Sequence, residues 1–503
     1  MNNILTKHKI PFLFFPLLIC FTGCILFWHF TPDDTFITLQ FARNLSLGNG
    51  FSFNPGSPTY GFTSPLWVMI LSLFYKFISD VLFAAKILGL LFSLVAVILF
   101  YILTSHFKLT NSWRNWATVA WAVDPYLWRW GVSGMETSLS VLLIIIPFLL
   151  YFYRNTARGS FFLGLSVSLL YLTRPEGLLF SLLVFLLLLT DYKYKRQLCW
   201  VYAIAFLLLT IPWWLYSLQT FGRFLTNTAS AKGGIVFSPS LWFRSFSRFF
   251  VLSISGYFGE LLSVSFFMVV IFKYLIKHLK SISTPTAFLF LWPLLLLFSY
   301  TVNGIGVISR YLIMVSPMFI ILGFYAIYKL QEHFRTRMVS INTFLLIAVL
   351  LPKILLTSTI SLVHTRKFSQ GMNQCLIPAG KWLAENSLKE SSVAVGDIGA
   401  IGYYSQRNIV DLGALISPEI KPLREKYSVH KIIDRLPEMP VFKVDYVIDT
   451  ATDSLRLLND SPYKGIFKPK WTGTMPSLGV ADPKTIWYYT IYKVNWPDLI
   501  ITQ

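Results

Sequence analysis

Two adjacent carboxylates are the residues of this 503-residue chain with the clearest chemical potential. Asp33 and Asp34 directly follow the first long apolar stretch, in FTPDDTFITLQFARNL. Neighbouring carboxylates repel each other, so the pair indicates a base, a metal site or a hydrated surface. A carboxylate can take the proton of an attacking hydroxyl, and two can hold Mg²⁺, Mn²⁺ or Ca²⁺. A simpler role stays open, because Pro32 ends the stretch and Asp33 could cap the following helix.

Two turns and one helix start place further charged side chains in apolar surroundings. Glu136 lies in GVSGMETSL, and Glu176 lies in LTRPEGLL, two residues after Arg174. Arg310 begins the apolar run of ISRYLIMVSP. The ordinary readings are a charge at a helix N-terminus, a surface ion pair and snorkelling. Ionisable groups at membrane depth are nevertheless functional candidates, and a planar guanidinium suits a phosphate.

The composition shows what must position these residues. Hydrophobic residues make up 55% of the chain and charged residues only 13%, against ~25% in a soluble domain. Disorder and a disulfide scaffold are excluded by the apolar content and by only 4 Cys. The net charge of +20 would suggest nucleic acid in a soluble protein, but residues 1–361 hold 26 basic and 9 acidic residues. We therefore expect a polytopic membrane protein whose charge records topology, and no nucleic-acid partner.

About eleven segments have the length and hydropathy of membrane spans. The basic loops between them place the N-terminus in the cytoplasm and, after an odd number of spans, the C-terminus outside. Two long outer loops are expected, 31–81 with helices lying in the membrane interface and 217–256. The first span lacks a cleavage site and is expected to be retained. The expected spans are about 11–30, 82–104, 115–131, 137–153, 159–173, 177–190, 198–216, 257–276, 286–302, 309–328 and 340–361.

The segment 362–503 has the composition of a soluble domain, with 17 basic and 14 acidic residues. SSVAVGD, RNIVDLG, VDYVIDT and TIWYYTIYKV predict strands, and 378–388 predicts a helix. We expect a small extracytoplasmic α/β domain. The chain has no GxGxxG, P-loop or Cys/His metal pattern, so no nucleotide cofactor is expected.

Four sequence pieces resemble the GT-C superfamily of polytopic glycosyltransferases, which use polyprenyl-phosphate sugar donors. They are PDD with its trailing ARNLSLGNGFSFNPGSPTYGFTSPLW, the SGMET turn, the TRPEG turn and the SRY helix start. The first piece is especially similar to the terminal arabinofuranosyltransferase branch. That branch also has a soluble tail like VAVGDIGAIGYYSQRNIVDLGALISPEI at 393–420.

The resemblance implies a GT-C fold with a membrane module over 1–361. It implies that Asp33 and Asp34 are the catalytic base or ligands of a divalent metal. Arg310 and Arg174 would bind the donor phosphate, with Glu136 and Glu176 as supporting acids. The aromatic belt of a membrane protein explains most aromatic residues at the boundary, but a sugar could stack on one or two of them. The candidate sugar or acceptor contacts are the aromatics Tyr60 and Trp67, and His29, which precedes the aspartate pair.

The implied function is inverting transfer of a sugar from a polyprenyl phosphate to a cell-envelope glycan or glycolipid, outside a bacterial inner membrane. One alternative is an oligosaccharide ligase with a polyprenyl-diphosphate donor, although such ligases usually lack the aspartate pair. A different class is a transporter or flippase for lipid-linked sugars. It predicts internal repeats and carboxylates in the middle of spans. No repeat is visible, and most of the nine acids map near the outer boundary.

Overall fold

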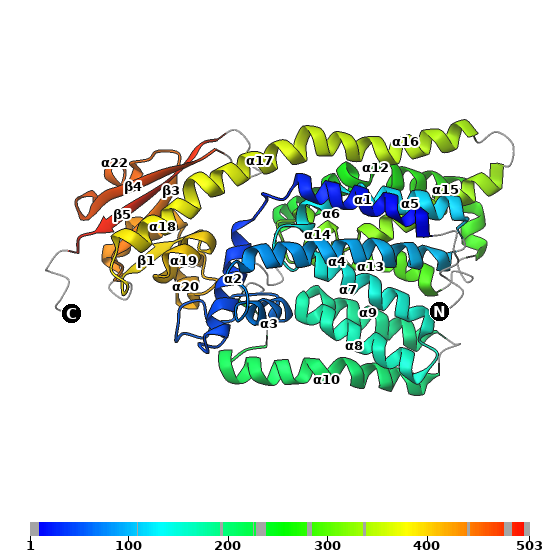
Figure 1. Ribbon diagram of the computed structural model, residues 1–503, viewed down its shortest axis with the longest axis horizontal. Helices are drawn as coiled ribbons and strands as arrows, with labels where there is room; N and C mark the ends of the chain where they lie inside the picture. Colours follow the sequence, from blue (N-terminus) through cyan, green and yellow to red (C-terminus); the bar gives the residue numbers. More distant parts are fainter. Residues whose placement is uncertain are drawn as a thin grey trace. The chain divides into compact units, whose positions relative to one another are not determined.

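A computed structural model describes residues 10–107, 109–191, 195–224, 226–227, 238–278, 284–334, 339–439, 443–476 and 485–496. The chain forms two compact units (Figure 1). The helical unit consists of Met1–Trp28, Ala85–Leu215 and Lys232–Ser361. The α/β unit consists of His29–Ala84, Tyr216–Ala231 and Leu362–Gln503. The α/β unit thus combines the tail with two segments that the sequence assigned to outer loops.

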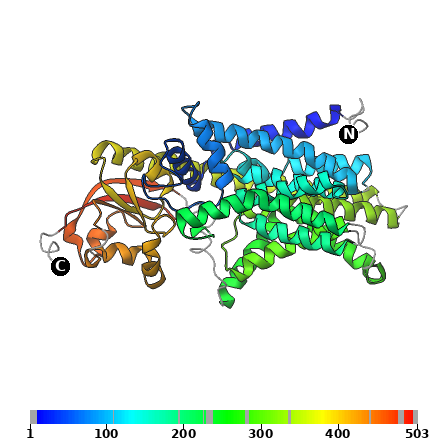
Figure 2. The same ribbon diagram turned by 90° about the horizontal axis from the view of Figure 1, so that it is seen from below.

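The helical unit is a bundle whose long helices run in similar or opposite directions (Figures 1 and 2). Its helices are α1 (Ile10–Leu26), α4 (Val81–Thr104), α5 (Asn111–Ala122), α6 (Pro125–Gly131), α7 (Thr137–Leu150), α8 (Ala157–Thr173), α9 (Glu176–Thr190), α10 (Arg196–Phe221), α12 (Pro239–His278), α13 (Thr284–Val302), α14 (Ser309–Leu312), α15 (Ser316–Phe334) and α16 (Val339–Leu355).

Each of the eleven expected spans contains helix. Among the described residues, five helices are long and apolar enough to cross a membrane: Val81–Phe107, Arg196–Phe221, Pro239–Val269, Thr284–Val302 and Thr343–Asn386. Others, such as Thr137–Tyr153 and Glu176–Thr190, are apolar but shorter. The structure is that of a multi-pass membrane protein, and the count of eleven remains a prediction.

One expected span, 115–131, is two helices. α5 ends at Ala122 and α6 begins at Pro125. Between them, the Asp124 carboxylate accepts the backbone N–H of Tyr126 at 2.8 Å and of Leu127 at 3.4 Å. Asp124 is therefore the N-cap of α6, followed by proline at the first helical position, a combination that starts a new helix.

Part of the second long outer loop is helical, because α12 begins at Pro239. The backbone of α12 is not helical at Tyr257, where the element kinks, so a second helical segment follows close to the expected span start at about 257. Glu260 lies near the start of that second segment. It forms a 2.7 Å ion pair with Lys353 of α16, and both side chains are completely buried. Lys353 also donates to the carbonyl of Ala120 at 3.1 Å.

The α/β unit contains one five-stranded mixed sheet in the order β2-β1-β3-β5-β4. β1 pairs in parallel with β2 and β3, and β5 pairs antiparallel with β3 and β4. Its helices are α2 (Asp33–Ser46), α3 (Pro65–Phe74), α17 (Leu362–Gly371), α18 (Ile377–Asn386), α19 (Gly399–Ser405), α20 (Lys421–Lys426), α21 (Val429–Asp434) and α22 (Arg456–Asn459). The strands are β1 (Ser392–Val395), β2 (Asn408–Asp411), β3 (Tyr446–Ala451), β4 (Phe467–Met475) and β5 (Trp487–Val494).

Two features of this unit escaped the sequence analysis. β4 was not predicted, because the proline and lysines of FKPKWTGTM interrupt the alternation of apolar and polar residues that is typical of a strand. The expected boundary at 361/362 falls inside a nearly continuous helical stretch: α16 is followed by π-helical turns at Leu356–Ser361, then by α17. The amino-acid composition therefore changes at residue 361, while the backbone remains helical across this position.

Candidate active site

Asp33 holds the first turn of α2 against α19. Its Oδ2 accepts the backbone N–H of Gly399 at 2.8 Å, and its Oδ1 accepts that of Ala400 at 2.7 Å. The N-cap of α2 is Pro32, so the expected capping of its own helix by Asp33 is wrong. Asp33 instead satisfies the first N–H groups of α19, 366 residues further along the chain.

A third carboxylate, Asp397, joins the aspartate pair. It lies between β1 and α19, and its Oδ2 accepts the hydroxyl of buried Tyr489 at 2.5 Å. Burial and the Asp34 carboxylate raise the pKa of Asp397 above its ordinary range, against the hydrogen bond from Tyr489. Asp33, Asp34 and Asp397 are all half-buried and form one acidic cluster in the α/β unit.

The pKa of Asp33 is also raised. Burial, the Asp397 carboxylate and, to a smaller extent, Asp34 raise its pKa from 3.8 to about 7, although the N–H groups of Ala400 and Gly399 lower it. A carboxyl group that titrates near neutral pH can exchange protons with a substrate, which is why such shifts mark functional sites.

This shift predicts how stability depends on pH. The pKa of Asp33 is higher in the folded chain than in the unfolded chain, so the folded state binds more protons between pH ~4 and ~7. Stability is therefore expected to fall as pH rises through this window and then to level off. Thermal unfolding of the full chain should show a smaller fall in Asp397→Asn, because that change lowers the pKa of Asp33.

The matched control is Asp460→Asn, at an exposed carboxylate elsewhere in the α/β unit. It should keep the wild-type profile. An unchanged profile in Asp397→Asn would contradict the coupling between Asp397 and Asp33.

In the helical unit, Arg174 joins the two predicted supporting acids. Its Nη1 donates to Glu136 at 2.8 Å and its Nη2 to Glu176 at 3.2 Å, and all three are mostly buried. The hydroxyl of Tyr300 donates to Glu176 at 2.8 Å. Two carboxylates therefore already neutralise Arg174, and its main role in this structure is to tie the start of α9 to the start of α7. The surface ion pair considered for Glu176 is wrong, because the pair is buried.

Arg310 lies near this network in a different environment. It is 8% exposed at the short helix α14, with its Nη1 3.4 Å from the sulfur of Met135 and its Nη2 3.4 Å from the hydroxyl of Tyr311. Both arginines contact the ring of Tyr311: the guanidinium carbon of Arg310 is 5.3 Å from the ring centre and that of Arg174 is 5.2 Å from it. Tyr311 thus connects the predicted pair of phosphate-binding arginines.

Two of the three predicted sugar contacts are buried. Tyr60 is 3% exposed and stacks on Phe221 with ring centres 4.9 Å apart. Trp67 is 1% exposed in α3. Both belong to the apolar core of the α/β unit, where a sugar cannot reach them, so these two predictions are not supported. His29 is exposed, and it remains a prediction.

A metal ion at the predicted site would need carboxylate oxygens of Asp33 and Asp34 as ligands. Both oxygens of Asp33 already accept backbone N–H groups. Within the described ranges, no three His, Cys, Asp or Glu side chains are grouped so as to hold a metal ion. Asp33 and Asp34 therefore do not form a complete metal site by themselves.

Sequence reasoning missed Asp397 and Tyr489. The signal for Asp397 was the tetrapeptide GDIG directly after a predicted strand, since polar residues at strand ends are common in functional sites. No local sequence pattern marks Tyr489, which lies in β5. The strand order of the folded sheet brings it into contact with Asp397.

Comparisons with known proteins address the fold. A family model described as a domain of unknown function (DUF8728) matches residues 365–492. No curated protein matches the chain. Among solved structures, the apo oligosaccharyltransferase of Archaeoglobus fulgidus aligns with a TM-score of 0.61 at 12% identity, over 89% of this chain and 70% of that one.

Two further structures contain ligands. ArnT from Cupriavidus metallidurans, bound to undecaprenyl phosphate, aligns with a TM-score of 0.59 at 11% identity, over 97% of this chain and 98% of that one. The Archaeoglobus fulgidus oligosaccharyltransferase in complex with Zn and sulfate aligns with a TM-score of 0.58 at 14% identity, over 87% of this chain and 67% of that one. The chain therefore has the fold of these membrane proteins, which is the GT-C fold.

Proposed function

We propose that this protein transfers a sugar from a polyprenyl-phosphate donor to a cell-envelope glycan or glycolipid, with inversion at the anomeric carbon. The observation that carries the proposal is the cluster of three carboxylates, Asp33, Asp34 and Asp397, where the start of α2 meets the start of α19. Alignment with ArnT over nearly the full length of both chains supports it. The site would face the outside of a bacterial inner membrane, with the N-terminus in the cytoplasm.

Within the cluster, we assign the base to Asp34. Both oxygens of Asp33 are held by the N–H groups of Gly399 and Ala400, so Asp33 is a positioning residue. Asp34 follows it on the same helical turn and is half-buried. Asp34 takes the proton of the acceptor hydroxyl while its oxygen bonds to the anomeric carbon. The bond from that carbon to the phosphate oxygen breaks, and polyprenyl phosphate leaves with the electron pair.

The negative charge that develops on the leaving phosphate needs a cation. We assign this role to Arg310, at the short helix α14, and treat Arg174, which pairs with Glu136 and Glu176, as a structural residue. A planar guanidinium can donate two parallel hydrogen bonds to a phosphate.

Arg310→Ala is expected to raise the KM for the lipid donor about 10- to 100-fold, the usual scale for a lost charge-assisted hydrogen bond. The KM for the acceptor should change little. Initial rates of polyprenyl-phosphate release at varied donor concentration measure this. Arg244→Ala, at an exposed arginine of α12, is the control. An unchanged donor KM in Arg310→Ala would contradict the assignment.

The similarity to an oligosaccharyltransferase keeps one alternative, transfer of a whole glycan from a polyprenyl diphosphate. The chain spans 70% of that protein but 98% of ArnT, which favours a monophosphate donor. The purified protein distinguishes the two when given the same sugar on polyprenyl phosphate and on polyprenyl diphosphate. Transfer from the monophosphate is expected. Transfer only from the diphosphate would overturn the proposed donor.

A further inference from the structure

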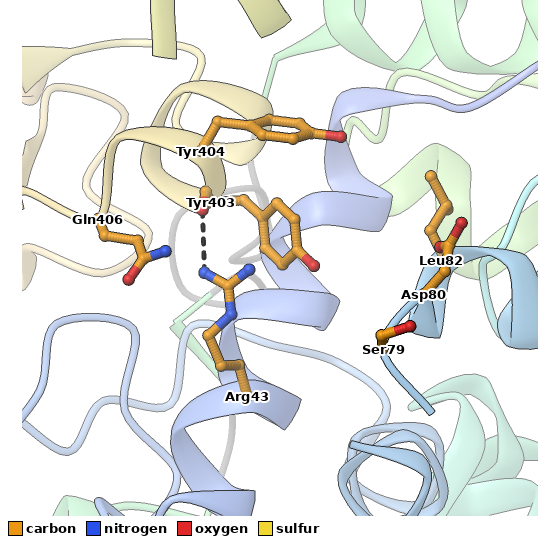
Figure 3. A pocket seen from close by; sticks show the side chains of 7 residues that line it. All are labelled: Arg43, Ser79, Asp80, Leu82, Tyr403, Tyr404 and Gln406. Atoms are coloured by element: carbon orange, nitrogen blue, oxygen red, sulfur yellow. Dashed lines mark hydrogen bonds between the residues drawn. The ribbon is translucent and has the colours of Figure 1, made fainter. Parts of the chain in front are cut away.

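A polar and aromatic pocket lies within the α/β unit, lined by none of the residues assigned so far (Figure 3). Its volume is about 420 Å³, within the usual range of small-molecule sites. It lies between α19, the last turn of α2 and the residues around the start of α4. The lining residues are Arg43, Ser79, Asp80, Leu82, Tyr403, Tyr404 and Gln406.

One wall of the pocket is held rigidly. Arg43 lies over the Tyr403 ring at 3.8 Å and donates from Nη1 to the Tyr403 carbonyl at 2.9 Å, the bond drawn in Figure 3. The Tyr75 hydroxyl donates to the Tyr403 hydroxyl at 3.0 Å. The ring of Tyr404 stands at 88° to that of Tyr403, with centres 5.2 Å apart. A wall fixed in this way needs little ordering when a ligand binds.

The polar groups fit hydroxyls better than an ion. Asp80 is exposed and uses Oδ1 to accept the Phe83 N–H at 2.9 Å, which leaves acceptor capacity toward the pocket. Arg43 has donors beyond Nη1, and the exposed Gln406 amide both donates and accepts. An anion would be repelled by Asp80 and a cation by Arg43. A neutral ring with several hydroxyls and an apolar face satisfies both charges and packs on tyrosine.

The surroundings indicate how such a ligand arrives. Asp80 directly precedes Val81–Phe107, a candidate membrane span. Leu73, Phe77 and Phe83 flank it in the sequence with large exposed apolar side chains, and Phe77 is 84% exposed. Exposed apolar residues next to a span are typical of a segment in the membrane interface. A ligand attached to a lipid would be presented at this level.

We propose that this pocket binds a saccharide unit of a membrane glycolipid, the acceptor side of the reaction. The claim that the bound saccharide is the acceptor rests on the proposed function. The claim that the pocket binds a saccharide rests on the pocket residues alone, because binding requires neither a donor nor Asp34.

The test uses the full chain in lipid nanodiscs and a panel of methyl glycosides, with binding followed by saturation-transfer NMR. Asp80→Asn removes the charge and keeps a residue that can cap α4. Gln406→Gly removes the amide, and glycine readily adopts the positive φ of 51° found there. The controls are Asp460→Asn and Gln370→Ala, at exposed positions outside the pocket.

At least one methyl glycoside should bind at millimolar concentration, and each pocket variant should weaken it by about fivefold or more. Both controls should bind like the wild type. A glycolipid with the same sugar, placed in the nanodisc, should bind more tightly than the methyl glycoside. Equal binding by pocket and control variants, or binding of inorganic phosphate but no glycoside, would overturn the saccharide site. Equal affinity for the two forms of the sugar would overturn the membrane source.

The outcomes also separate this proposal from the proposed function. Asp34→Asn should keep glycoside binding while it loses transfer. Glycoside binding without any sugar transfer by the wild type would contradict the enzyme and leave the pocket standing.

Discussion

Asp34→Asn is expected to lower the rate of sugar transfer by about 10²- to 10⁴-fold, the usual contribution of a general base. Asparagine has nearly the same shape but cannot take the acceptor proton, so the protein should stay folded. Initial rates and thermal unfolding of the purified full chain measure the two properties separately. Asp460→Asn, at an exposed position of the same unit, should change neither.

Asp33→Asn should behave differently from Asp34→Asn. An asparagine amide has one acceptor oxygen, whereas Asp33 accepts two N–H groups, from Gly399 and Ala400. One N–H would lose its partner, which typically costs about 1–3 kcal/mol. We expect Asp33→Asn to unfold at lower temperature as well as to lose activity. Full activity in Asp34→Asn, with loss only in a stable Asp33→Asn, would reverse the assignment of base and positioning residue.

Gly399→Ala is expected to have the second largest effect. A Cβ added at Gly399 would lie 2.1 Å from the carbonyl oxygen of Asp33 and 2.6 Å from its Cγ. Backbone atoms cannot yield cheaply, so the first turn of α2 must move away from α19. Overpacking of this kind costs about 1–3 kcal/mol. Because Asp34 lies on the displaced turn, transfer should also fall by about 100-fold.

The same loop offers the control. A Cβ added at Gly396 meets nothing within 4 Å, and Gly396 has no positive φ. Gly396→Ala should therefore keep both stability and activity. Wild-type activity in Gly399→Ala would contradict the claim that contact between α19 and the first turn of α2 positions the acidic cluster.

Much of the fold follows from local sequence patterns. Apolar runs located helix in every expected span, and alternation located β1, β2, β3 and β5. The break at Asp124 was missed because hydropathy continues across it, while the cap and Pro125 act on the backbone. The helical segment between Pro239 and the kink at Tyr257 was missed, because Ser, Arg and Phe between 239 and 256 resemble a loop in composition.

The candidate site could be predicted only in part. Asp33 and Asp34 stand out locally as adjacent acids after an apolar stretch. Their partners Gly399, Asp397 and Tyr489 lie hundreds of residues away, and only the folded sheet brings them together. Tyr60 and Trp67 had the right residue type for a sugar contact, but burial in an aromatic core removed them.

The central claim is tested most directly by mass spectrometry of envelope glycans and glycolipids from a strain that lacks this protein. We predict the loss of one sugar residue, restored by the wild-type chain and by Gly396→Ala but not by Asp34→Asn. An unchanged set of glycans in the deletion strain, or full restoration by Asp34→Asn, would contradict the account.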